Sequence, residues 1–425
     1  MKRTILFLVA LLAAATFRPQ GVPGATGATE PVGAPEDAPA ATTGGARVVL
    51  ERSVESLETT QPTASPVELW MEKFDLAGRR LPRGVRSLGV PMSDPAGGAL
   101  SAEGPVGENF PISNVPTDVS STESLDRSSV AYNPQRGEYF VVWHATTRAA
   151  RNNIYGRFVS AAGSPLGALF AIAETAGIEL APSVAYDADA NQYWVAWTDL
   201  GSGSTGDIHL IRLSPTGAPL GGDIVVNEAG PVAFAARVAF GAGRCMVVWV
   251  SGPGDATAQI LLRAYDSAGN ALTSIMPLSD AAGVSTEPDI AFNPTDQNFL
   301  VVWNQQQAGT GWDVKSLGIT PDFNSFSPQT VTSATGDQRT PRISFSVPAG
   351  RYLVVWYDGR SQQTYDIYGR LVGRDGVRLG NDISIYAGVY NDAVAVVAGS
   401  ATTSQFAVVL SVEAVTDTEY VPVAL

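Results

Sequence analysis

The sequence predicts an all-β fold built from repeated four-stranded sheets. An apolar stretch ending in tryptophan recurs five times, at Trp143, Trp197, Trp249, Trp303 and Trp356. The intervals are 54, 52, 54 and 53 residues, a regularity that indicates an internal structural repeat. The 43 glycines and 28 prolines supply the many turns that short strands require. We find no segment with a sustained helical period.

Each repeat contains four strand-like runs, which we name a to d. In the second repeat they are residues 183–186, 193–197, 207–213 and 223–227. Run b is apolar at nearly every position, so we expect it to be covered on both faces. Four strands per unit of about 53 residues, repeated around an axis, are typical of a β-propeller blade. A parallel β-helix is the alternative, but its coils are shorter than this unit.

The turns of the repeat also recur. The a–b turns contain Asn-Pro or Gly, as in 133–138 and 293–298, and both are turn formers. The c–d turns share the pattern Gly-x-x-Leu-Gly at 163–167, 217–221 and 376–380. We expect these glycines to adopt positive φ and the leucine to pack back on the blade.

The ends of the repeat array predict how the ring closes. Residues 393–397, 406–410 and 420–425 resemble strands a, b and c of a last unit that has no strand d. Residues 100–112 resemble the end of a strand c and a strand d. We therefore predict six four-stranded blades over 100–425, closed by an N-terminal strand that pairs with the C-terminal blade. Residues 47–99 are an N-terminal extension or a degenerate seventh blade.

The N-terminus has the pattern of an export signal. Lys2 and Arg3 precede eleven apolar residues, and Ala13 and Ala15 suit a signal-peptidase site. Eleven residues span about 16 Å as a helix, about half of a membrane's hydrocarbon core. We therefore expect 1–15 to be a signal peptide and 16–46, rich in Ala, Gly, Pro and Thr, to be a linker. The expected location is secreted, extracellular or periplasmic, without membrane insertion.

Charge and composition exclude several classes of partner and cofactor. Asp and Glu (41) outnumber Lys and Arg (27), which gives a net charge of −14. Nucleic acid and anionic membranes would be repelled by such a surface. With two His and one Cys, most zinc sites and all Cys-x-x-Cys chemistry are excluded. We expect no metal and no cofactor, although calcium in acidic loops stays open. Cys245 is expected to be a small buried hydrophobe.

A resemblance follows from these motifs. The pattern VAYNP, YLVVW, DIYGR and G-x-PLG resembles the tandem propeller-type repeats of exported bacterial proteins of unknown role, over about 100–425. The blades are also similar to sialidase-like and kelch-like propellers. The sialidase Asp-box and the kelch double glycine do not occur in the sequence, so the resemblance implies a fold and no catalytic residue.

The candidate functional residues come from the long b–c loops and the d–a connections, which share one face of a propeller. On that face we select for ligand binding His144, Arg148, Trp312, Arg339, Asp358 and Arg360. Asp199 and Asp358 both stand two residues after the repeat tryptophan, which favours a turn-bracing role. His209 stands where sister units have tyrosine, which favours a structural role. Glu179 and Glu287 also enter strand a on this face.

The sequence leaves three functions open. The first expectation is a non-enzymatic propeller that binds a protein or a glycan through the b–c/d–a loop face, because no catalytic set is evident. The alternatives are a propeller-type polysaccharide lyase or glycosidase that uses His144, and a structural surface module. The oligomeric state and the identity of the ligand stay open.

Overall fold

The computed structural model describes residues 92–93, 99–100, 128–146, 152–201, 206–228, 231–252, 257–281, 283–307, 311–361, 365–387, 392–413 and 418–424. All regular structure in these ranges is β-strand, apart from turns and bends. The 100–112 segment that we expect to close the ring lies almost entirely outside them.

The described strands form consecutive antiparallel sheets. The first contains β3 (Ser129–Asn133), β4 (Glu138–Thr146), β5 (Asn152–Ser160) and β6 (Pro165–Ala173). The second contains β7 (Glu179–Asp187), β8 (Gln192–Asp199), β9 (Asp207–Leu213) and β10 (Ile224–Val225). The third contains β11 (Ala233–Gly241), β12 (Arg244–Ser251), β13 (Gln259–Tyr265) and β14 (Met276–Pro277).

Three more sheets follow along the chain. One contains β15 (Ser285–Asn293), β16 (Asn298–Gln307), β17 (Gly311–Ile319) and β18 (Gln329–Thr332). The next contains β19 (Gln338–Ser346), β20 (Arg351–Asp358), β21 (Asp366–Gly373) and β22 (Arg378–Tyr386). The last has three strands, β23 (Asp392–Gly399), β24 (Phe406–Glu413) and β25 (Thr418–Ala424). A separate ribbon pairs β1 (Met92–Ser93) with β2 (Ala99–Leu100).

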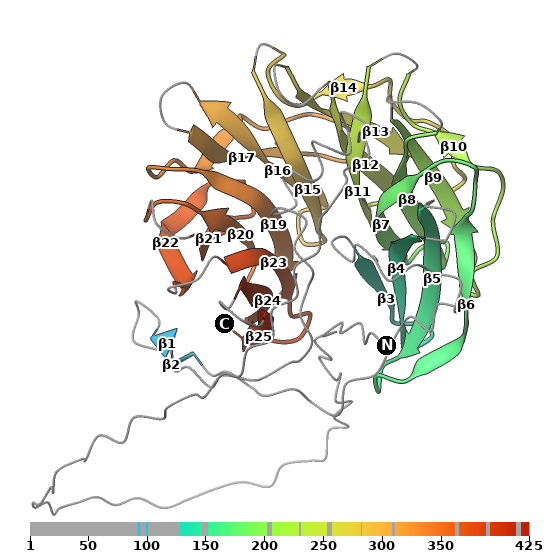
Figure 1. The fold of residues 1–425 in the computed structure, drawn as a ribbon, viewed down its shortest axis with the longest axis horizontal. Coiled ribbons are helices and arrows are strands. Elements are labelled where there is room, and N and C mark those ends of the chain that lie inside the picture. Colours follow the sequence, from blue (N-terminus) through green and yellow to red (C-terminus); the bar gives the residue numbers. More distant parts are fainter. Residues whose placement is uncertain are drawn as a thin grey trace, which may run out of the picture. The chain divides into compact units, whose positions relative to one another are not determined.

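The sheets follow one another as blades do in a propeller (Figure 1). The first strands of successive sheets, β3, β7, β11, β15, β19 and β23, pack against one another in chain order. Each sheet then runs outward from that strand. This arrangement confirms the predicted all-β, propeller-type architecture of four-stranded antiparallel sheets.

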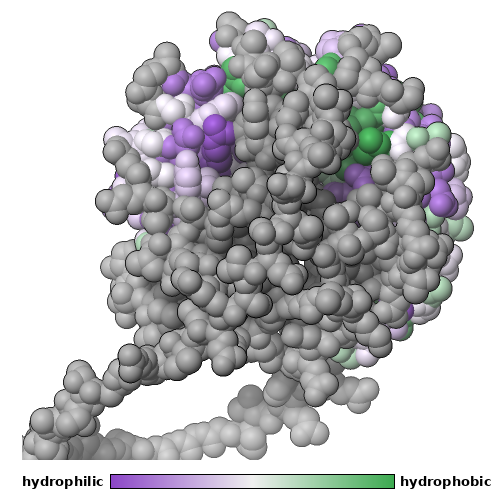
Figure 2. All heavy atoms as spheres, in the orientation of Figure 1, coloured by the Kyte–Doolittle hydropathy of each residue, from purple (hydrophilic) through white to green (hydrophobic). Residues whose placement is uncertain are grey.

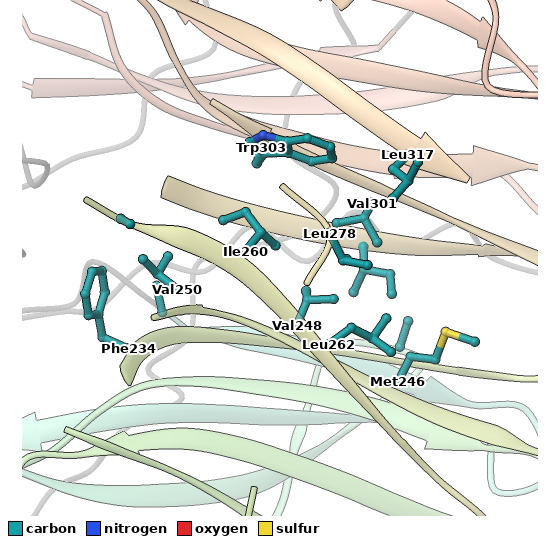
Figure 3. Packing of buried hydrophobic residues seen from close by; sticks show 14 of the residues in the cluster. Phe234, Met246, Val248, Val250, Ile260, Leu262, Leu278, Val301, Trp303 and Leu317 are labelled. Atoms are coloured by element: carbon teal, nitrogen blue, oxygen red, sulfur yellow. The ribbon is translucent and has the colours of Figure 1, made fainter. Parts of the chain in front are cut away.

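The repeat tryptophans lie in the hydrophobic core, as predicted. All five are at most 3% exposed, because each stands on the second strand of its sheet, between neighbouring sheets. In the largest cluster, Trp303, Val301 and Leu317 face Val248 and Ile260 of the preceding sheet (Figure 3). Cys245 is also fully buried, as expected for a small hydrophobe.

Side chains of the first strands link neighbouring sheets. In each link an oxygen of one strand accepts the backbone N–H of the next, 54 or 55 residues later. The pairs are Ser129 with Val184 (3.1 Å), Ser183 with Val238 (3.1 Å), Asp289 with Ile343 (3.0 Å) and Ser344 with Gly399 (2.8 Å). These hydrogen bonds satisfy strand amides that would otherwise lack partners at an inner edge.

A β-bulge recurs near the start of four of these strands. Its central residues are Ala181, Ala235, Glu287 and Thr340, with φ of 52°, 57°, 55° and 48°. The strand register shifts by one residue at each bulge. Left-handed φ costs about 1 kcal/mol or more in residues with a Cβ, so a bulge repeated in four sheets indicates that the fold requires it.

The turns agree with the sequence except in one detail. Gly163, Gly217 and Gly376 have φ of 82° to 88°, as expected. The leucines of the same turns, Leu166, Leu220 and Leu379, are 37% to 39% exposed and do not pack back on the blade. They lie on or beside the outermost strand, which has neighbours on one side only. On the side seen in Figure 2, the described surface is mainly hydrophilic with smaller hydrophobic patches.

Within the described residues, no helix has the length and apolar character needed to cross a membrane.

Candidate functional site

The predicted site residues that the structure describes belong to three sheets: His144 to β3–β6, Trp312 to β15–β18, and Arg339, Asp358 and Arg360 to β19–β22 or the loop after β20. His144 lies on β4 opposite Ile154 and is 3% exposed. Arg148 lies outside the described residues. Trp312 and Arg339 meet, with the Arg339 guanidinium 4.3 Å from the centre of the Trp312 ring. Asp337 links the two residues, because it accepts the Trp312 backbone N–H at 3.3 Å and binds Arg339 Nε at 3.2 Å.

Aromatic and charged groups surround this Trp312–Arg339 pair. Tyr357 is paired with Arg339 across the sheet and stacks on Tyr365 with 4.1 Å between ring centres. Burial, with the neighbouring Tyr365, Glu287 and Asp337, raises the pKa of Tyr357 far above its ordinary range, so its hydroxyl stays neutral. The pair is thus well packed and serves as a rigid part of the loop face.

Asp358 and Arg360 form a charged cluster at the end of β20. Arg360 Nη2 lies 2.6 Å from Asp358 and 2.8 Å from Asp382, so one guanidinium holds two carboxylates. Its guanidinium also covers the Tyr368 ring at 3.9 Å. Asp358 is fully buried and accepts the Arg360 backbone N–H at 2.9 Å. This geometry is that of a braced turn, with its charges balanced locally.

The β7–β10 sheet holds a different set of groups at the same repeat positions. Asp199 and Asp223 stand where Asp358 and Asp382 stand. His209 pairs with the repeat tryptophan as Tyr368 does. The two remaining positions change from Gln338 to Glu179 and from Arg360 to Gly201. The β7–β10 sheet has therefore lost a permanent cation and gained a carboxyl and an imidazole.

The bulge in β7 brings Glu179 opposite Asp199. Beyond the bulge the pairing is Ser183 with Ala196, a register that would place Leu180 opposite Asp199. The shift of one residue at Ala181 places Glu179 there instead. Directly opposed residues of an antiparallel pair have Cβ atoms about 5 Å apart, so the two carboxyl groups are neighbours.

The packing around this carboxyl pair is close. Glu179 has no exposed surface, and its Oε1 accepts hydrogen bonds from the backbone N–H and hydroxyl of Thr175. Oε2 of Glu179 is buried and has no hydrogen-bond partner among the described residues. A Cβ on Gly177 would lie 2.6 Å from Asp199 Oδ1, so only glycine permits the approach of this loop. Asp199 Oδ1 accepts the Gly201 N–H at 2.7 Å.

His209 lies on the solvent side of the cluster. Its Nδ1 is 2.6 Å from Asp223, its Nε2 is 3.8 Å from Asp199, and its ring stacks on Trp197 at 5.5 Å. The side chains of His209 and Asp199 are 16% and 15% exposed, and that of Asp223 is 43% exposed. The cluster is thus reached from solvent through Asp223, His209 and Asp199, with Glu179 behind them.

The environment changes the acidity of two groups. Burial raises the pKa of the Glu179 carboxyl, and the nearby Asp199 charge raises it further, against the hydrogen bonds from Thr175, which lower it. Burial alone would lower the pKa of His209, but the hydrogen bond to Asp223 and the charges of the surrounding aspartates outweigh it and raise that pKa. A carboxyl whose pKa is raised beside a second carboxyl is an arrangement suited to general acid–base chemistry.

Sequence reasoning placed Glu179 on the b–c/d–a loop face but did not select it, and it assigned His209 only a structural role. The stacking of His209 on Trp197 agrees with that role, and its contacts with Asp199 and Asp223 add a second one. A detectable signal was present: the residues at matched repeat positions change character between two sheets. Within the described residues, no group of three or more His, Cys, Asp or Glu side chains is arranged to hold a metal ion.

Comparison with known proteins finds similarity to solved structures. Neither protein-family models nor curated proteins match this sequence. Solved structures do, and they are propellers of the sialidase and arabinofuranosidase type. One is the Hadza microbial sialidase Hz136, with 12% identity and a TM-score of 0.48 over 69% of this chain and 65% of that one. This chain thus spans about two thirds of the sialidase's length.

Two further structures show the same degree of similarity. The GH93 α-L-arabinofuranosidase of Fusarium graminearum in complex with arabinobiose has 10% identity and a TM-score of 0.49, over 73% of this chain and 95% of that one. A neuraminidase-like protein from A/bat/Guatemala/164/2009 has 11% identity and a TM-score of 0.48, over 79% and 92%.

These structures correct the expectation of a non-enzymatic binding propeller. They carry the names of sialidases, arabinofuranosidases and neuraminidase-like proteins, and none of these names is that of a binding module. The sequence expectation rested on the lack of a catalytic motif along the chain, and such a search does not detect residues that a bulge brings together across two strands, as it does Glu179 and Asp199. At this identity the similarity concerns the fold, so the reaction is argued below from this chain's own residues.

Proposed function

We propose that this protein is a glycosidase whose reacting groups are Glu179 and Asp199. The observation that supports the proposal is the carboxyl pair across β7 and β8, in which burial raises the pKa of one member, Glu179. Glycosidases use two carboxyl groups, one as acid and one as base or nucleophile. The matched position in the β19–β22 sheet is Gln338, which cannot act as an acid, so the strand geometry alone does not require a carboxyl there.

Each member of the pair has a role in this proposal. In this proposal the loop that holds Thr175 and Gly177 moves aside when the saccharide binds, because Glu179 has no exposed surface while the loop covers it. Glu179 then donates its proton to the leaving oxygen as the glycosidic C–O bond breaks. Asp199 attacks the anomeric carbon and forms a glycosyl ester, which water then hydrolyses with Glu179 as the base. The direct cross-strand pairing of the two residues leads us to the retaining route, since retaining enzymes keep their carboxyl groups about 5–5.5 Å apart and inverting enzymes about 6.5–9.5 Å. His209 positions Asp199 from the solvent side.

The rest of the loop face is proposed to bind the remainder of the saccharide. It includes the predicted residues Arg148, Trp312 and Arg339, whereas His144 is buried within β4 and is not proposed to contact the ligand. Asp358 and Arg360 hold the end of β20 in place for the same face. Trp312 and Arg339 present a packed aromatic and cationic edge of the kind that orients polar ligands.

We further propose that six blades close into a ring through a strand from 100–112 beside β25, with 47–99 as an extension. The protein is exported after loss of residues 1–15, and residues 16–46 link the signal to the domain. Mass spectrometry of protein recovered from culture medium tests the cleavage site. A crosslink between cysteines placed at Phe110 and Val423 tests the closure, and intracellular accumulation or a missing crosslink would contradict these proposals.

Hydrolysis of a panel of aryl glycosides and of oligosaccharides with different sugars tests the activity. We expect Glu179→Gln and Asp199→Asn each to lower kcat at least about 1000-fold, the scale of removing an acid or a nucleophile. Asp189→Asn is the matched control, because Asp189 is an exposed carboxylate at the other end of the same sheet. NMR of the first-formed anomer tests retention.

The outcomes separate the alternatives. Full activity in both variants would contradict the assignment of Glu179 and Asp199. Inversion of the anomeric configuration would contradict the nucleophilic role of Asp199. An unsaturated sugar among the products would indicate a lyase instead of a hydrolase.

A further inference from the structure

Two matched carboxylate pairs in this protein differ in what lies between them. In the β19–β22 sheet, the Arg360 guanidinium lies between Asp358 and Asp382, at 2.6 and 2.8 Å. In the β7–β10 sheet, Asp199 and Asp223 stand at the same repeat positions. The fold therefore demonstrates, within one chain, which chemical group such a pair can hold: a nitrogen cation.

The β7–β10 pair has room for such a cation. Gly201 replaces Arg360, and a Cβ at Gly201 would meet nothing within 4 Å. His209 binds Asp223 but stays 3.8 Å from Asp199, beyond hydrogen-bond distance. The imidazole therefore does not span the two carboxylates as Arg360 does in the sister sheet.

The surrounding charges favour a cation more strongly here than in the sister sheet. Asp207 lies near the His209 ring, and its carboxylate accepts a hydrogen bond from Asn227 at 3.0 Å. Behind the pair, Glu179 is fully buried with one carboxyl oxygen that has no partner among the described residues. In the sister sheet, by contrast, Arg370 supplies a second guanidinium to Asp382 at 2.7 Å.

We propose that the β7–β10 cluster binds the ammonium group of an amino sugar between Asp199 and Asp223. This inference rests on the proposed glycosidase function and adds the substrate class to it. In a 2-amino sugar the ammonium is on the carbon next to the anomeric carbon, so Asp199 reaches both the reacting centre and the amine. A compact ammonium with three donors also suits the space beside His209 better than a planar guanidinium does.

The same charges exclude saccharides with carboxylate, sulfate or phosphate groups at this position. An anion beside Asp199, Asp223 and Asp207 meets like charges in a partly desolvated site, which costs affinity. The substrate class inferred from this cluster is therefore distinct from the acidic sugar implied by the word sialidase.

Calorimetric titration with two matched probes tests the proposal without requiring turnover. The probes are a glucosamine hexasaccharide and its fully N-acetylated form, at a pH at which the amines are protonated. We expect the amine form to bind at least about tenfold more tightly, because a charge-assisted hydrogen bond is worth about that factor. Asp223→Asn should remove the preference, whereas Asp189→Asn should keep it. Asp223 is half exposed, so its variant is expected to fold.

Equal binding of the two probes, or an unchanged preference in Asp223→Asn, would overturn the amino-sugar assignment. Tighter binding of the acetylated probe would do the same. If the amine preference is observed but no glycoside is cleaved, the proposed glycosidase function fails and the cation site stands. If glycosides are cleaved without amine preference, the proposed glycosidase function stands and the cation site fails.

Discussion

The guanidinium of Arg360 allows a quantitative test of how burial affects the contribution of an ion pair to the free energy of unfolding. Its side chain is 25% exposed, and its partners Asp358 and Asp382 are 0% and 12% exposed. Arg374 and Asp296 form the comparison pair at 3.0 Å, with both side chains at least 40% exposed. Replacing each arginine by methionine removes one cation and keeps most of the apolar stem.

Arg360→Met leaves the Asp358 carboxylate buried without its guanidinium. Breaking a buried pair costs about 3–5 kcal/mol. We expect about 2–3 kcal/mol here, because Asp358 keeps hydrogen bonds from Trp356 Nε1 at 2.7 Å and from the backbone N–H of residue 360. Arg374→Met should cost at most about 1 kcal/mol, as for other exposed pairs.

Urea denaturation with a constant m-value measures both changes in the free energy of unfolding. At about 2–4 °C of melting temperature for each kcal/mol, the expected loss for Arg360→Met is about 4–12 °C. Equal losses in the two variants would refute the reasoning, because the two arginines differ mainly in burial. A change in m-value would show that the native fold itself had changed.

Three further predictions concern the β7–β10 cluster and the packing between sheets. The pKa of His209 is raised in the folded state. Its contribution to the free energy of unfolding is therefore full below its unfolded pKa of about 6.5 and is lost as pH rises through the folded pKa. His209→Tyr should flatten that part of the curve of stability against pH, measured by urea titration. Because burial raises the pKa of Glu179, its ionised form opposes folding, and Glu179→Gln should raise the melting temperature at neutral pH but not in acid. Gly241→Ala places a Cβ 2.3 Å from the Phe292 ring and should lower the free energy of unfolding by about 1–3 kcal/mol, as measured by calorimetry. A Cβ at Gly222 meets nothing within 4 Å, so Gly222→Ala should change that free energy by less than about 1 kcal/mol. The His209 reasoning would be contradicted if His209→Tyr kept the same slope of stability against pH in that range. The Glu179 reasoning would be contradicted by a lower melting temperature of Glu179→Gln at neutral pH. Equal stability of the two glycine variants would contradict the packing argument.

The repeat made the core and the turns predictable. The spacing of the tryptophans required equivalent environments, and the apolar run beside each one required cover on both faces. The structure accordingly buries Trp249 and Trp356 completely. The turn glycines were predictable because positive φ is costly for other residues, and Gly217 adopts 88° as expected.

The bulges were not predictable in the same way. Ala181 and Glu287 adopt positive φ although neither residue type favours it. The conformation is imposed by the packing of neighbouring first strands, which single-sequence patterns do not encode. Because the Glu179–Asp199 pairing depends on the register shift at this bulge, the sequence could mark the two positions as unusual for the repeat but could not show that they pair.

The hydrogen bonds between successive first strands have a consequence for how such a chain can change in length. Each hydrogen bond joins equivalent positions in adjacent sheets. Deleting or duplicating a whole unit therefore preserves a compatible donor and acceptor at the new junction. Ser129, for example, could accept the backbone N–H of Val238 as well as that of Val184. A deletion of half a unit destroys that match. Recombination between neighbouring copies is thus an evolutionary route by which this architecture can gain or lose sheets while its interior stays intact.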